Sequence, residues 1–156
     1  MHNQISTLEK PRDAGEAAID GLLGGMFAGL LMGLTILLAG LLAGETPTSV
    51  LERFSTGQAA TPLSGSFAHL AVSSVYGVVF SVLVYGLPRR WLSIVPGWLA
   101  GLLYAALLLL LAVSVLLPGL QSPLNQLPLW VLAAGHAVYG VVLGQRVYPQ
   151  KRDLVA

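Results

Sequence analysis

The sequence predicts an all-α integral membrane protein: a four-helix bundle made of two parallel tandem helical-hairpin repeats. Hydrophobic residues make up 55% of the 156 positions, charged residues only 10%, and the mean hydropathy is +0.76. This composition lies far from the average of soluble proteins. Four long apolar runs are each long enough to cross a bilayer as a helix, which takes roughly 20 residues. The segment GMFAGLL at 25–31 returns as GWLAGLL at 97–103, which indicates an internal duplication.

The predicted spans cover residues 21–44, 62–87, 91–117 and 128–146, and Arg146 at the very end is their only charged residue. Peptide groups in hydrocarbon must find partners inside the segment, so runs this continuous predict helices and not open strands. Acidic residues precede the first run, which also exceeds the apolar core of a signal peptide, so it is expected to be retained. We expect a cytoplasmic N-terminal segment at 1–20 and one membrane domain at 21–156.

Each repeat contains two spans, the first at about 21–87 and the second at about 91–146. Because two spans return the chain to its starting side, both copies enter the membrane in the same direction. This predicts parallel repeats related by a pseudo-two-fold axis along the membrane normal, unlike the inverted repeats of many transporters.

Basic residues cluster on one side of the predicted spans. They stand before the first, between the second and third, and after the fourth, at Lys10, Arg12, Arg89, Arg90, Arg146, Lys151 and Arg152. Arg53 alone falls in the two opposite connections. The positive-inside rule therefore places both termini in the cytoplasm.

The two outer connections differ in composition. Residues 49–54 within the first predict a short interfacial helix, capped by Thr48 or Ser49. The second, at 118–128, has three prolines and no charge. Proline removes a backbone donor and fixes φ, so this connection is expected to be ordered but irregular rather than helical.

Small residues recur every four positions along the spans. Membrane helices associate where small residues let their backbones approach, so these positions predict a tightly packed bundle. The predicted packing glycines are Gly21, Gly25, Gly29, Gly33, Gly77, Gly97, Gly101, Gly140 and Gly144.

Several classes of function lack their residues. Apart from Arg146 at the very end of the fourth span, no acidic or basic side chain lies in the spans, although ion-coupled carriers normally place such groups there. Carboxylate pairs and Ser–His–Asp arrangements are missing, and the chain has no cysteine. The net charge of +1 forms no basic face for nucleic acid. We therefore assign no catalytic residue, no metal site and no nucleic-acid partner.

Two histidines, His69 and His136, stand within the second and fourth spans on the small-residue faces. Counted from the outer span ends their depths differ by about 3 Å; aligned on the two Tyr-Gly pairs, which we prefer, they differ by about 6 Å. The favoured interpretation is a pair of neutral imidazoles hydrogen-bonded inside the bundle. The main alternative is a haem b held by both rings, with Arg53 at its propionates; a quinone or pigment contact is a further one.

A glycine-rich helix with Ala28-Gly29, followed by a helix running from His69 to Tyr76-Gly77, resembles small multi-pass bacterial inner-membrane families without an assigned function. The resemblance covers most of the four spans. It implies a multi-pass membrane protein and carries over no site residues.

These observations favour a non-catalytic membrane subunit that stabilises a larger respiratory, photosynthetic or transport complex. Its expected contacts are membrane lipids, which we expect to be bound, and other subunits or copies of itself. No cofactor is expected on this interpretation. The alternatives are a haem b electron-transfer module using His69 and His136, and a small uncoupled carrier along the pseudo-symmetry axis.

Overall fold

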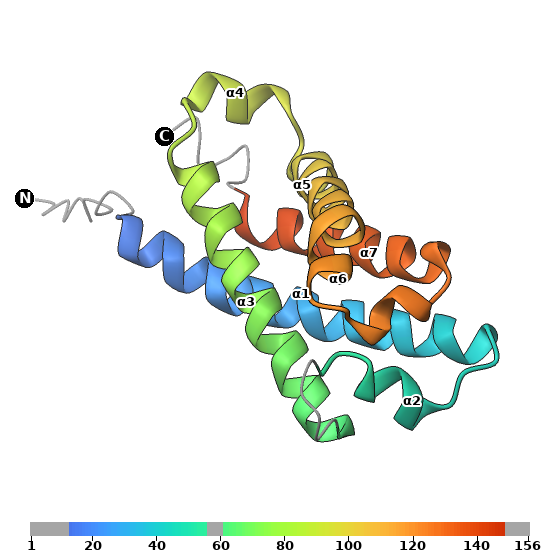
Figure 1. Cartoon of the computed structure of the whole chain (residues 1–156). Helices are drawn as coiled ribbons and strands as arrows, with labels where there is room; N and C mark the ends of the chain where they lie inside the picture. Colours follow the sequence, from blue (N-terminus) through green and yellow to red (C-terminus); the bar gives the residue numbers. More distant parts are fainter. Residues whose placement is uncertain (1–12, 56–60, 149–156) are drawn as a thin grey trace, which may run out of the picture.

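The computed structural model describes residues 13–55 and 61–148, and this part of the chain is helical throughout, without strands. Expectations on residues 1–12, 56–60 and 149–156 lie outside the described residues. Three helical segments are long and apolar enough to cross a membrane: Ala14–Leu42, Pro62–Tyr85 and Gly97–Gly119. Figure 1 shows the helices in sequence order.

The first helix, α1 (Ala14–Leu42), begins seven residues before the predicted span. Asp13 and Glu16 explain the early start, because they form a capping box: the Asp13 carboxylate accepts from the Glu16 N–H, and the Glu16 carboxylate accepts from the Asp13 N–H. After the helix, Gly44 adopts a φ of 90°, a left-handed conformation that glycine reaches without steric cost. The chain turns there toward the outer connection.

The first outer connection contains the predicted short helix, α2 (Pro47–Glu52), but its cap differs from expectation. Thr46, and not Thr48 or Ser49, accepts from the Ser49 N–H. Pro47 explains the shift, since its fixed φ suits the first helical position. The next helix, α3 (Pro62–Tyr85), begins in the same way, with Thr61 as cap and a proline at the first position.

The prediction of one continuous helix at 91–117 is wrong. The structure has a short helix, α4 (Arg89–Ile94), then a break, then α5 (Gly97–Leu111). Pro96 causes the break, because a residue before proline is disfavoured in the helical conformation, and Val95 is extended (φ −96°, ψ 125°). The helix continues beyond α5 through a π-helical turn, η1 (Ala112–Leu116), into α6 (Leu117–Gly119). Pro118 accounts for the wider turn, since its ring would clash with a regular helical carbonyl four residues earlier.

The connection at 118–128 is partly helical, which corrects the expectation of irregular structure. α6 reaches Gly119, and a 3-10 turn, η2 (Pro123–Gln126), follows, capped by the Ser122 hydroxyl. Proline suits the first position of such turns, so prolines here begin helical turns as well as ending them. The last helix, α7 (Leu129–Val147), lies within one residue of its predicted range at each end.

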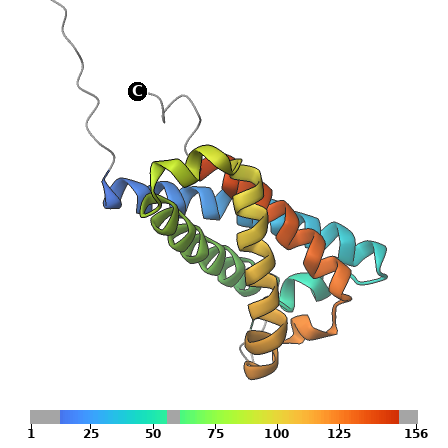
Figure 2. The ribbon, with the colours of Figure 1, turned by 90° about the horizontal axis from the view of Figure 1, so that it is seen from above.

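The helices pack as a chain of neighbours rather than as a closed square. α1 packs against α3 and α7, and α7 packs against α5, whereas α3 and α5 approach each other only at isolated points. Figures 1 and 2 show this arrangement from two directions. Residues of both α3 and α5 line the candidate site.

Candidate functional site

The α1–α3 contact is built on glycine. A Cβ atom at Gly25 would lie 2.6 Å from the Ser73 carbonyl oxygen and 2.8 Å from the Cα of Gly77, both closer than real side chains come. Gly21 likewise faces Gly77, and Gly29 faces the Ser73 side chain. The two backbones therefore touch directly, in antiparallel register, over two helical turns.

The α5–α7 contact repeats this construction. A Cβ at Gly97 would lie 2.6 Å from the carbonyl oxygen of Gly144, and one at Gly101 would lie 2.8 Å from the Cα of Gly144. Gly140 faces Gly101 and the Ala105 methyl group. Eight of the nine predicted packing glycines belong to these two contacts, and Gly33 lies against the His69 ring instead.

The two glycine contacts place the histidines at matching positions. Gly77 lies between Gly21 and Gly25, and Gly144 lies between Gly97 and Gly101. His69 precedes Gly77 by eight residues, and His136 precedes Gly144 by the same number. Relative to the glycine contacts, the two histidines therefore occupy the same position along their helices. This agrees with the depth counted from the span ends and not with the preferred Tyr-Gly alignment.

Both imidazoles bind backbone carbonyls. The Nε2 of His69 donates to the Gly29 carbonyl on α1 over 2.8 Å, and the Nδ1 of His136 donates to the Leu132 carbonyl in its own helix over 2.8 Å. A carbonyl oxygen only accepts hydrogen bonds, so these nitrogens carry the protons. In the neutral rings the Nδ1 of His69 and the Nε2 of His136 remain as acceptors.

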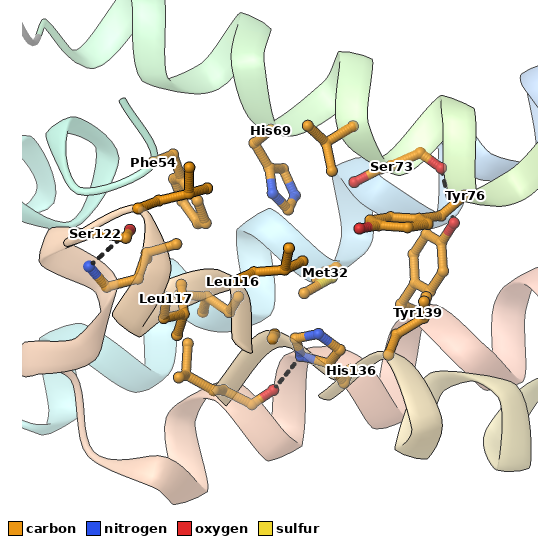
Figure 3. A pocket seen from close by; sticks show the side chains of 17 residues that line it. Met32, Phe54, His69, Ser73, Tyr76, Leu116, Leu117, Ser122, His136 and Tyr139 are labelled. Atoms are coloured by element: carbon orange, nitrogen blue, oxygen red, sulfur yellow. Dashed lines mark hydrogen bonds between the residues drawn. The ribbon is translucent and has the colours of Figure 1, made fainter. Parts of the chain in front are cut away.

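A cavity of about 190 Å³ lies between the two histidines. α1 contributes Met32 and Ile36 to it, α3 and α7 contribute the imidazoles, and Figure 3 shows Met32 between the two rings. The segment from α5 to α6 covers the cavity with aliphatic side chains, and Phe54 lies at one end with its ring 4.4 Å from that of His69. The lining is mostly apolar, with a few polar groups.

Two tyrosines fix the other end of the cavity. The Tyr139 hydroxyl donates to the Ser73 carbonyl over 2.7 Å and so joins α7 to α3. The Tyr104 hydroxyl donates to the Tyr76 carbonyl over 2.9 Å and joins α5 to α3. These bonds hold the walls of the cavity together where no glycine contact exists.

The residues present do not fit a haem b. A volume of about 190 Å³ is below the roughly 300–1,000 Å³ of ordinary small-molecule pockets, and a macrocycle needs more than one ring's space. Arg53, the predicted propionate partner, already binds both oxygens of Glu45 over 2.8 Å and the Gln126 side chain over 2.8 Å. The structure brings His69 and His136 to one cavity but leaves Arg53 in a separate surface ion pair.

Sequence reasoning missed Met32 and Phe54 as lining residues. Met32 follows Gly29 by three positions, so the two residues lie on the same face of α1. This spacing could have indicated Met32 as a lining residue. Phe54 follows Arg53 in the connection, and nothing in its local sequence indicates a position against His69.

No group of three or more His, Cys, Asp or Glu side chains that could hold a metal ion is found within residues 13–55 and 61–148. The histidine pair lines a small, mostly apolar cavity. Comparison of the chain with protein-family models, curated proteins and solved structures gives no match.

Proposed function

We propose that the protein is a non-catalytic subunit of a larger membrane complex in a bacterial inner membrane, where it crosses the bilayer four times with both termini in the cytoplasm. The complex would be respiratory, photosynthetic or a transporter. The uncovered surface of α5 is the observation that carries this proposal.

A fourth crossing by α7 is supported by its length. Its 19 residues extend about 28 Å as a helix, close to the thickness of the hydrocarbon layer. Its contacts support the same view, because α7 packs against both α1 and α5.

The duplicated hairpin is supported by the two glycine contacts. Each joins the first helix of one predicted repeat to the second helix of the same repeat, and in each the histidine precedes the central glycine, Gly77 or Gly144, by eight residues. Two copies of one hairpin would produce this correspondence.

The helix α5 and its continuation leave most of their surface free. Only 11% of the most apolar stretch of Gly97–Gly119 is buried in the chain, against 39% for α1. The exposed face carries Ala106, Leu107, Leu110 and the polar residue Ser114. Small and hydroxylated residues are what membrane helices use to join one another, so this face suits a helix of another subunit.

A non-catalytic role is supported by the way polar groups are used. Ser81 donates to the Ala17 carbonyl over 2.6 Å, and the two histidines and two bonded tyrosines also bind backbone carbonyls. Four of these five groups thus bond to a neighbouring helix, and His136 bonds within α7.

The absence of native cysteine makes a direct test simple. Leu107→Cys on α5 and Val75→Cys on α3, with exposed fractions of 65% and 60%, carry a photoactivatable thiol reagent in intact membranes. We expect Leu107→Cys to cross-link to one defined protein and Val75→Cys to lipid. Lipid adducts alone from both positions would contradict the proposal.

A further inference from the structure

The histidine cavity has the features of a ligand site open to the bilayer. Its floor is α1, its walls are α3 and α7, and its cover is the segment from α5 to α6. Close backbone contacts between α3 and α5 are few, and the Tyr104 hydroxyl of α5 donates to the Tyr76 carbonyl of α3 beside the cavity. We propose that the cavity binds the ring of a lipid-soluble hydroquinone whose tail leaves between α3 and α5.

The volume limits the ligand to one ring. An apolar cavity of about 150 Å³ in another protein accommodates benzene, so about 190 Å³ accommodates one substituted six-membered ring. Met32, Ile36 and Leu108 give this space the apolar lining that a ring requires. A fused or macrocyclic ring system exceeds the space.

The polar groups select the hydroxylated form of such a ring. His69 and His136 each use one nitrogen as a donor to a backbone carbonyl, so each has only an acceptor left. They line the cavity from opposite helices, as Figure 3 shows. Two acceptors on opposite walls match the two hydroxyl donors at opposite ends of a hydroquinone, whereas the oxidised quinone offers only acceptors. The hydroxyl groups of Ser73, Tyr76 and Ser122 also line the cavity and can donate to either form of the ring, so the preference rests on the two imidazoles.

The cover of the cavity departs from regular helix at the same place. Ala112 and Leu116, the first and last residues of the π-helical turn η1, both line the cavity. Widened turns of this kind occur frequently at functional sites. The turn therefore lies in the wall of the cavity, on the side where the proposed tail would leave.

The test measures binding to the full-length protein in lipid nanodiscs by calorimetry. The probes are 2-decyl-1,4-hydroquinone, kept reduced under argon, and its oxidised quinone. We expect the hydroquinone to bind at least about tenfold more tightly, since one hydrogen bond of ordinary strength contributes a factor of about that size. Equal affinities, or no binding of the hydroquinone, would overturn the proposal without any variant being needed.

Two variants locate the site. His136→Phe keeps a ring of similar shape and removes only a bond within α7, so we expect it to fold, to bind the hydroquinone about tenfold more weakly and to lose the preference over the quinone. Ala112→Phe fills the cavity and should abolish binding, whereas Ala106→Phe, on the exposed face of α5, should leave it unchanged. Unchanged binding by Ala112→Phe would show that the probe binds elsewhere.

Discussion

The hydroxyl of Tyr139 donates a 2.7 Å hydrogen bond to the backbone carbonyl of Ser73, 66 residues earlier in the chain. Only 2% of Tyr139 is exposed, and it is one of the largest fully buried side chains of the described structure. The bond lies next to the glycine contact between α1 and α3, because a Cβ at Gly25 would meet the same Ser73 carbonyl. One carbonyl group thus connects three helices.

Removing this hydroxyl should weaken the link between α7 and α3. We expect Tyr139→Phe to lower the free energy of unfolding by about 0.6–1.7 kcal/mol, the range measured for hydrogen bonds between membrane helices. Reversible unfolding in mixed detergent micelles measures the difference. Tyr85→Phe is the control, since Tyr85 is 48% exposed, and an equal loss in both variants would contradict the assigned role.

A methyl group at the centre of the α1–α3 contact should separate the two helices. In Gly77→Ala the new Cβ would meet the Gly21 carbonyl and would lie 2.5 Å from the Cα of Gly25, so backbone must move. We expect a loss of about 1–3 kcal/mol, the usual cost of overpacking. Gly119→Ala, where a Cβ meets nothing within 4 Å, is the control, and the same unfolding assay applies.

The equivalent position in the second contact extends this prediction. Gly144→Ala should cost as much as Gly77→Ala, because its Cβ would meet the Gly97 carbonyl and lie 3.1 Å from the Cα of Gly101. A Gly144→Ala variant as stable as the wild type would argue against two equivalent hairpins.

The outer ion pair should make stability depend on pH. Hydrogen bonds from Ser49 and then from Arg53 lower the pKa of Glu45 below its ordinary value of 4.5. A carboxyl group with a lowered pKa stabilises the folded state above its unfolded pKa, and this contribution disappears as the pH falls through the folded pKa. Unfolding followed from pH 7 downward should show this loss below about pH 4.5 in the wild type, and Glu45→Gln should flatten it. An unchanged slope in Glu45→Gln would contradict the expectation.

The topology can be read from single cysteines in the cysteine-free chain. With a membrane-impermeant thiol reagent on intact cells, we expect labelling of Thr48→Cys and Asn125→Cys and protection of Gly86→Cys and Gln145→Cys, because the basic residues mark the cytoplasmic side. Permeabilised cells should label all four. If Gln145→Cys were labelled together with Asn125→Cys, α7 would not cross the membrane.

The helical fold and the main apolar segments could be predicted from the sequence, because lipid leaves a chain few ways to satisfy its backbone. Interruptions were harder to predict: Pro96 ends a helical turn in the middle of an apolar run, and Pro118 widens one without ending it. Because both residues are prolines, composition alone does not distinguish a break in the helix from a widened turn.

The candidate site was predictable only in part. The small-residue spacing correctly indicated that His69 and His136 face the interior. The relative depth of the two histidines depended on the register between the helices. That register is set by which glycines pair with one another, and a single sequence does not show the pairing. The ion pair of Arg53 with Glu45 joins residues eight positions apart across a turn. It engages the residue that was predicted to bind the haem propionates.

The position of Arg53 has a consequence for the cavity. Its guanidinium connects the two outer connections through Glu45 and Gln126, and the next residue, Phe54, lies against His69. The peptide unit between Arg53 and Phe54 therefore joins this hydrogen-bonded network to the end wall of the cavity. We expect that a displacement of the network would also displace the Phe54 ring.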